Sequence, residues 1–328
     1  MWQVIGQTQA TRLLDRSVKT GQLSHAYLFV GPPHVGKMTL ALNLAQAVNC
    51  HDGQDAPCGE CAACTRIARG KHADVQVVAP TSDGKRDTGI DQIRQLQESA
   101  SLPPYEGKCK VFIFDRADTL SNEAANCLLK TLEEPSPRVL MVLLSAREKD
   151  LLPTIVSRCQ RVELRPVPLC TVQEALAGRH TLAAGRSDLI ARLAGGCLGW
   201  AFSAVDQGEL IDTRNERLAE LLDVLQARPG ERLNYADALA AGFSKRRSDV
   251  EERLALWVEW WHDLLRIKAG HDELISNIDF QDTLWKQANH FNMRQVIDSI
   301  HHLQEAGQQL ERNANPRLAL EVLMLSMP

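Results

Sequence analysis

A glycine-rich segment between an apolar run and a helical pattern constrains the fold of this chain more than any other feature. Gly31, Gly36 and Lys37 have the Gly-x4-Gly-Lys spacing, preceded by the apolar run 26–30 and followed by helical periodicity over 37–48. In such a loop, backbone N–H groups and the start of the helix stabilise phosphate charge, and the lysine reaches the outer phosphates. The spacing predicts a phosphate-binding loop, and the alternative is a plain Gly/Pro turn beside a surface lysine.

Strand and helix patterns alternate through the first half of the chain. Apolar runs predict strands at 75–79, 111–114, 139–144 and 161–164, helical patterns lie at 90–100 and 121–134, and the polar stretch 81–88 predicts a loop. Alternation of this kind predicts a parallel sheet with helices on both faces. After residue 168 the β-rich runs stop, and helical spacing continues to the end of the chain.

The fold class that follows is α/β plus all-α. We expect an α/β domain at 1–166 that carries a cysteine-rich insert at 50–64, a small helical lid at 167–208 and a helical domain at 209–328. Within the last domain, one stripe of an amphipathic helix carries Trp257 and Trp261, which with Trp260 are predicted to lie in a core or a helix–helix interface. Asn315 and Pro316 predict the cap and first residue of the final helix.

The predicted nucleotide site departs from the pattern of a hydrolysing enzyme at two positions. Met38 follows the loop lysine where a Ser or Thr hydroxyl normally holds Mg²⁺, although Thr39 follows and could contact a phosphate. Asp115 ends an apolar strand and is suited to hold Mg²⁺, but the next residue is Arg116, which stays protonated and cannot activate water. The sequence thus predicts no hydrolysis by this chain and leaves open whether ATP and Mg²⁺ occupy the loop.

Four of the nine cysteines are clustered as Cys50-x7-Cys58-x2-Cys61-x2-Cys64. Zn²⁺ favours four thiolates in a closed tetrahedron, and four cysteines leave no open position for catalysis. The insert is too polar to build a core, so a metal would supply the folding energy that it lacks. We therefore predict a structural zinc, with free thiols as the alternative.

The formal net charge of −4 excludes a polycation built to bind nucleic acid by itself, so any DNA contact needs a local patch or an assembly. No apolar run is long enough to span a bilayer and no signal peptide is apparent, which predicts a cytoplasmic protein.

Two polar segments remain ambiguous from their residues alone. Arg158 precedes the last predicted strand and could bind phosphate oxygens through two hydrogen bonds. An isolated arginine there is more often a solvated surface residue. Glu133 and Glu134 end a predicted helix at its negative pole, where they are mildly unfavourable. A contact role and a solvated polar edge both stay open for these glutamates.

Several segments together resemble the bacterial clamp-loader subunits of the AAA+ type. These segments are 24–29, the cysteine cluster 50–64, 125–135 with Lys-Thr-Leu-Glu-Glu-Pro, 152–159 with Ser-Arg-Cys, and 315–321. The resemblance spans nearly the whole chain. It implies a heteropentamer with gamma/tau and delta subunits, in which the helical tail forms a collar.

Within that family, Met38, Arg116 and Trp200 depart from the ATP-hydrolysing gamma/tau motor and favour its non-hydrolysing partner type. The resemblance then implies that Arg158 completes an ATP site on an adjacent motor subunit. It also implies contact with the sliding clamp and primer–template DNA through the assembly. Two alternatives remain: an active motor ATPase, and a zinc-containing adaptor outside replication.

Overall fold

Five parallel strands form the sheet, in the order β2-β3-β4-β1-β5. Their bounds are β1 Ala26–Val30, β2 Val75–Val78, β3 Lys110–Phe114, β4 Val139–Ser145 and β5 Gln160–Glu163. Every residue of β1, β3 and β4 is buried, because helices cover both faces of the sheet and continuous apolar runs suit such strands. The edge strand β2 leaves Gln76 and Val77 exposed. The predicted parallel α/β sheet is confirmed.

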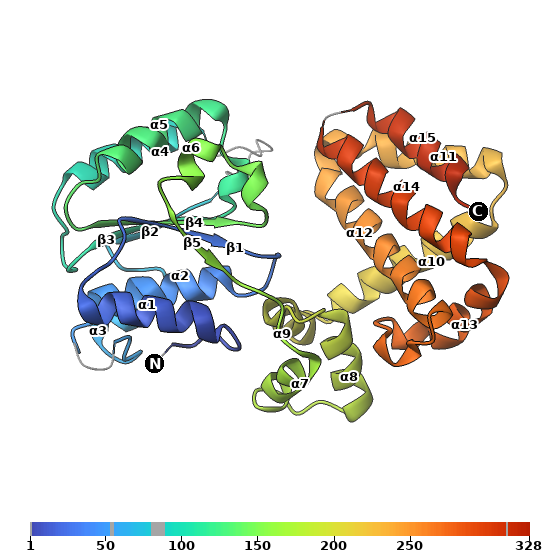
Figure 1. The fold of residues 1–328 in the computed structure, drawn as a ribbon, viewed down its shortest axis with the longest axis horizontal. Coiled ribbons are helices and arrows are strands. Elements are labelled where there is room, and N and C mark those ends of the chain that lie inside the picture. Colours follow the sequence, from blue (N-terminus) through green and yellow to red (C-terminus); the bar gives the residue numbers. More distant parts are fainter. Residues whose placement is uncertain (1, 53–55, 80–88, 313) are drawn as a thin grey trace. The chain divides into compact units, whose positions relative to one another are not determined.

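The computed structural model describes residues 2–52, 56–79, 89–312 and 314–328 (Figure 1). The loop predicted at 81–88 lies outside the described residues. The chain divides into two compact units, Met1–Ala175 with Gly196–Trp200 and Leu176–Gly195 with Ala201–Pro328. We call them the sheet unit and the helical unit. The domain boundaries predicted from the sequence stay a prediction.

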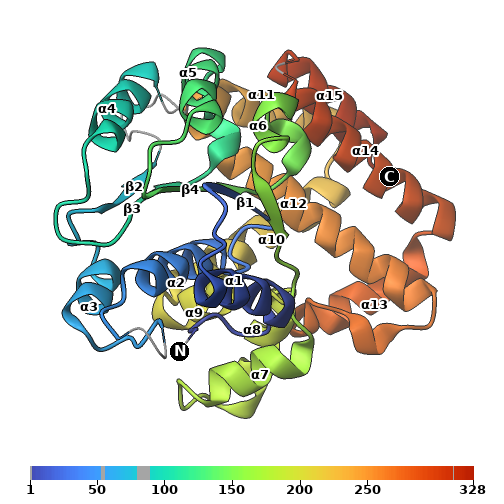
Figure 2. The same ribbon diagram turned by 60° about the vertical axis from the view of Figure 1, so that its left-hand side comes forward.

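Helices pack on both faces of the sheet within the sheet unit (Figures 1 and 2). The helices are α1 Thr8–Thr20, α2 Lys37–Asn49, α3 Ala62–Ala68, α4 Ile90–Ser101, α5 Asn122–Glu133 and α6 Pro153–Val156, with 3-10 turns at Ala117–Thr119 and Glu148–Asp150. Alternate residues of β3 enter different cores: Phe112 and Phe114 join the core under α4 and α5, while Val111 and Ile113 join the core under α1 and α2. This alternation follows from the two-residue period of a strand.

The rest of the chain is helical, as the spacing predicts, and no strand follows β5 among the described residues. The elements are α7 Leu169–Ala177, α8 Ala184–Leu193, α9 Leu198–Asp206, α10 Glu209–Gln226, α11 Pro229–Ala241, α12 Phe243–Lys268, α13 Gln281–His290, α14 Met293–Glu311 and α15 Pro316–Ser326, with 3-10 turns at Asp272–Leu274 and Ile278–Phe280. Trp257, Trp260 and Trp261 are fully buried in the helical unit. They are core residues, one of the two roles predicted for them.

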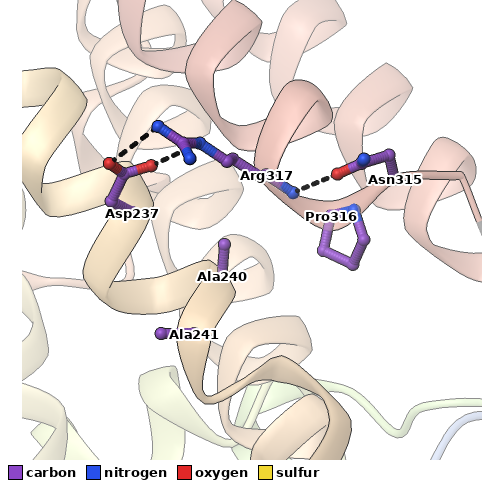
Figure 3. Close-up of a pocket in the computed structure, with 6 residues that line it drawn as sticks. All are labelled: Asp237, Ala240, Ala241, Asn315, Pro316 and Arg317. Carbon is purple, nitrogen blue, oxygen red and sulfur yellow. Dashed lines mark hydrogen bonds and ion pairs between the residues drawn. The ribbon is translucent and has the colours of Figure 1, made fainter.

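The final helix begins as predicted, because Asn315 Oδ1 accepts hydrogen bonds from the backbone N–H of Arg317 at 3.0 Å and Leu318 at 3.4 Å. Helix α15 lies beside α11 in both ribbon views. An open pocket of about 450 Å³ lies between the end of α11 and this cap (Figure 3). Arg317 and Asp237 are among its lining residues, and Arg317 Nε is 2.9 Å from Asp237 Oδ1. In the described ranges, no helix is both long and apolar enough to cross a membrane.

Candidate functional site

The predicted phosphate loop connects β1 to α2, and packing accounts for two of its residues. A Cβ added at Gly31 would come within 2.4 Å of the backbone oxygen of Leu164, so a larger residue cannot fit there without movement. Gly36 has a φ of 107°, a left-handed conformation that favours glycine. Both glycines are therefore required by backbone geometry, whether or not a phosphate binds.

The loop lysine contacts the loop itself. Lys37 Nζ donates hydrogen bonds to the carbonyl oxygens of Gly31 at 2.6 Å and Pro32 at 2.8 Å. Burial lowers the pKa of Lys37, and the nearby carboxylates of Asp118 and Asp115 offset that effect only in part. A lysine that is to bind a phosphate would have to give up these two hydrogen bonds.

Of the two positions that depart from a hydrolysing site, one follows the loop lysine and the other lies just after β3. Met38 is half-buried and packs against the core under α1 and α2, whereas Thr39 is exposed in the first turn of α2. Asp115 follows β3, where its backbone N–H donates to Val78 O at 2.8 Å. Arg116 is exposed and has a φ of 54°, so the residue in the water-activating position has a left-handed backbone and a cationic side chain.

Two further features, one in the loop and one at Asp118, whose charge acts on Lys37, were not predicted from the sequence. The backbone N–H of Gly199 donates to His34 O at 2.9 Å, and a Cβ at Gly199 would lie 2.7 Å from that oxygen. Asp118 has one buried carboxylate oxygen, Oδ1, with no hydrogen-bond partner among the described residues. The Gly-Cys-Leu-Gly pattern at 196–199 is the signal for the first contact, since closely approaching backbones need glycine.

The four clustered cysteines come together at the far end of α2. The Sγ atoms of Cys50, Cys58, Cys61 and Cys64 all lie within 4.8 Å of one another, and Cys58 Sγ and Cys64 Sγ are 3.9 Å apart. A zinc tetrahedron with Zn–S bonds of about 2.3 Å places its sulfurs about 3.8 Å apart. The cluster could therefore hold a metal ion of this size.

The local structure explains how these thiols converge. Cys50 is the residue just after α2, Cys61 caps the start of α3, and Cys64 lies in the first turn of α3. Helix α3 is tied to α2 by a hydrogen bond from Gln46 Nε2 to Cys64 O at 2.9 Å. Burial alone would raise the pKa of Cys61, but hydrogen bonds from the backbone of Cys64 and His51 outweigh it and lower that pKa to about 6.

Arg158 lies two residues after α6 and contacts neither the loop nor the cysteines in the described structure. Its Nη2 is 2.7 Å from Glu133 Oε1, and its Nη1 donates to Thr154 O at 2.9 Å. The side chain keeps 36% of its surface exposed. Burial raises the pKa of the Cys159 thiol, the next residue in the chain, to about 12. Glu133 therefore forms an ion pair within the chain, and it stays partly exposed.

Family profiles match the two halves of the chain. The profile described as "DNA polymerase III, delta subunit" matches residues 6–168, and "DNA polymerase III, delta subunit, C terminal" matches residues 209–327. Among curated proteins, DNA polymerase III subunit delta' of Bacillus subtilis is 30% identical, and the match covers 98% of this chain and 96% of that protein.

The tau subunits are also similar, but the match covers a smaller part of them. The Bacillus subtilis subunit is 28% identical over 99% of this chain and 60% of its own length. The Escherichia coli subunit is 34% identical over 78% of this chain and 41% of its own length.

Among solved structures, a DNA polymerase III gamma-subunit-related protein from Thermotoga maritima has a TM-score of 0.48 at 19% identity, covering 95% of this chain and 97% of that chain. The match to subunit delta' extends over nearly the full length of both proteins. The chain belongs to the delta-prime family of DNA polymerase III clamp-loader subunits.

Proposed function

We propose that this chain works in a clamp-loader assembly without hydrolysing ATP itself, and that Arg158 reaches the nucleotide bound to a neighbouring gamma/tau-type motor subunit. The observation that carries the proposal is the accessibility of Arg158, whose side chain is 36% exposed while it is held by two contacts. A planar guanidinium suits bidentate recognition of phosphate oxygens. Its permanent charge would stabilise the negative charge that develops during phosphoryl transfer.

The phosphate loop of this chain supports the other half of the proposal. Met38 offers a thioether where a hard cation needs oxygen ligands, and Arg116 cannot accept a proton from water. Lys37 is already hydrogen-bonded to two loop carbonyls. If ATP and Mg²⁺ enter this loop, Gly31, Gly36, Lys37, Thr39 and Asp115 are the residues that would contact them, and slow or no turnover would follow.

Family membership supports the proposed partners. Similar proteins are named as subunits delta' and tau of DNA polymerase III, so we propose assembly with gamma/tau and delta subunits in a heteropentamer. The helical domain at 209–328 would form the collar, with a lid at 167–208 and the α/β domain at 1–166. Sliding clamp and primer–template DNA would be contacted through the assembly, since the net charge of −4 gives this chain little attraction for DNA.

We also propose that the cysteine cluster binds a structural zinc ion through Cys50, Cys58, Cys61 and Cys64. Four sulfurs within 4.8 Å of one another match the size of a zinc site, and two of the cysteines are buried. All four positions of the tetrahedron would be filled by protein, which leaves none for a reacting water.

The test of the function is ATP turnover, stimulated by clamp and primed DNA, in a loader rebuilt with its partner subunits. Arg158→Ala should lower turnover at least tenfold, or about 1.4 kcal/mol of barrier, while size measurements show that the assembly still forms. The isolated chain should show no turnover. Equal turnover by an intact assembly with alanine at this position would contradict the role of Arg158.

The zinc proposal is tested by metal analysis of the purified chain. We expect one zinc ion per chain, and Cys61→Ser should release it or weaken its binding strongly, because three thiolates leave the tetrahedron incomplete. Cys170→Ser, which changes an exposed cysteine outside the cluster, is the matched control and should keep the metal. A wild-type chain that carries no zinc after purification in metal-containing medium would contradict the proposal.

A further inference from the structure

Two motifs that lie apart in the sequence meet at one corner of the sheet unit. Glu133 is the last residue of α5, and Arg158 follows α6. Glu133 Oε1 and Arg158 Nη2 are 2.7 Å apart. Nη1 of the same guanidinium donates to Thr154 O at 2.9 Å and lies 3.5 Å from Ser157 Oγ. The guanidinium is thus held from two sides by different elements.

Helices α5 and α6 pack on the same core, so the distance between them is fixed. This core, between the sheet and the helices, buries Leu128 and Leu132 of α5 together with Ile155 of α6. The backbone after α6 is also constrained, since the N–H of Arg158 donates to Ile155 O at 3.1 Å. Because close packing holds the backbone here, Arg158 can move mainly by rotation about its side-chain bonds.

The ion pair does little for the stability of the fold. Glu133 and Arg158 keep 49% and 36% of their side-chain surfaces exposed, and pairs at such exposure add little. A carboxylate in the last turn of a helix is also disfavoured by the helix dipole. What the contact does control is the direction in which the guanidinium points.

We infer that Glu133 is a positioning residue that fixes the rotamer of Arg158 for its action on the nucleotide of a neighbouring subunit. The inference rests on the proposed function of Arg158. A guanidinium has five N–H donors. Glu133 and Thr154 engage Nη2 and Nη1, and no hydrogen bond among the described residues uses Nε. Donors therefore remain for phosphate oxygens while the side chain is held in place.

Loss of Glu133 should act through the torsions of Arg158. Each released sp³ torsion has three staggered wells, so freeing one or two of them lowers the correctly oriented population roughly three- to tenfold. Glu133→Ala should lower the turnover of the rebuilt assembly by that factor at saturating ATP. Glu133→Gln retains an acceptor for Nη2 and should recover part of the loss. Glu134→Ala changes the adjacent, exposed carboxylate and should leave turnover unchanged.

A double-variant cycle separates positioning from a general structural effect. The assembly is rebuilt with Arg158→Ala, Glu133→Ala and the double variant, and size measurements confirm that each assembly forms. If Glu133 acts through Arg158, Glu133→Ala has no further effect on turnover once Arg158 is alanine. A further fall of threefold or more in the double variant would overturn the inference.

Other outcomes distinguish this inference from the function on which it rests. If Arg158→Ala lowers turnover and Glu133→Ala leaves it unchanged, the inference is wrong and the proposed function stands. If Glu133→Ala raises turnover, Glu133 withholds the arginine instead of presenting it, and the inference is again wrong. If Arg158→Ala itself has no effect in an intact assembly, the proposed function fails first.

Discussion

Lys37 and Arg158 are cations carried by two motifs of the same sheet unit, and their surroundings differ. Lys37 is half-buried, donates to two carbonyls of its own loop and has a pKa lowered by burial. Arg158 is 36% exposed and pairs with one carboxylate. The phosphate-loop motif is the easier of the two to find in the sequence, yet its lysine, Lys37, already donates hydrogen bonds to carbonyl oxygens of its own loop. The cation that remains accessible belongs to the less obvious motif.

The comparison predicts that the two cations differ most in their effect on the assembly. Arg158→Ala should lower stimulated ATP turnover at least tenfold, because an arginine supplied to a neighbour's phosphoryl transfer is worth roughly 10³–10⁵ in rate. Lys37→Ala in the same assembly should change turnover by less than about twofold, because we propose that the loop of Lys37 does not hydrolyse ATP. A twofold change corresponds to about 0.4 kcal/mol of activation barrier. Parallel turnover assays on assemblies of verified size measure both variants, and equal losses of turnover would contradict the expected difference between the two cations.

A second prediction concerns why the loop retains its glycines. Gly31→Ala should lower the free energy of unfolding by roughly 1–3 kcal/mol, because the new Cβ would overlap the backbone oxygen of Leu164. Gly185→Ala is the control, since no atom lies within 4 Å of its added Cβ. Denaturant unfolding of both variants tests the effect. An unchanged stability for Gly31→Ala would mean that the loop is kept for a ligand and not for packing.

The smallest expected effect is the pH dependence that Lys37 gives to stability. A lysine with a lowered pKa in the folded state binds fewer protons there than in the unfolded chain. Its contribution to the free energy of unfolding therefore rises with pH between that lowered pKa and the ordinary lysine pKa of 10.5. The stability difference between wild type and Lys37→Met should grow in favour of wild type over this window. Lys71→Met, at an exposed position, should show no such trend.

Much of the sheet unit could be predicted because its information is local. Continuous apolar runs identify buried parallel strands, as for β1, β3 and β4, and the cysteine spacing identifies the metal-sized cluster. The Asn315 cap of α15 likewise follows from residues adjacent in the chain. In each case the residues that form the structure lie close together in the sequence, so their pattern is enough to predict it.

The contacts that decide the roles of the site residues could not be predicted in this way. Lys37 donates to the carbonyl oxygens of Gly31 and Pro32, and the direction of its side chain depends on torsions that the Gly-x4-Gly-Lys spacing does not predict. The pairing of Glu133 with Arg158 needs the relative position of two helix ends, which only the packed core determines. The sequence could flag the glutamates as odd for a helix end, but it could not name their partner.

The alternation of β3 between two cores limits how this chain can change in evolution. One core contains Val111 and Ile113, and the other contains Phe112 and Phe114. One residue inserted within β3 would therefore turn the following residues of that strand to the opposite face of the sheet. The connection between α2 and α3, residues 50–61, carries three of the four clustered cysteines and contains no strand among its described residues, so added length there alters no strand pairing. Lineages that gained or lost such a segment could therefore do so without disturbing the sheet, and we expect length differences among relatives to fall there and spare the strands.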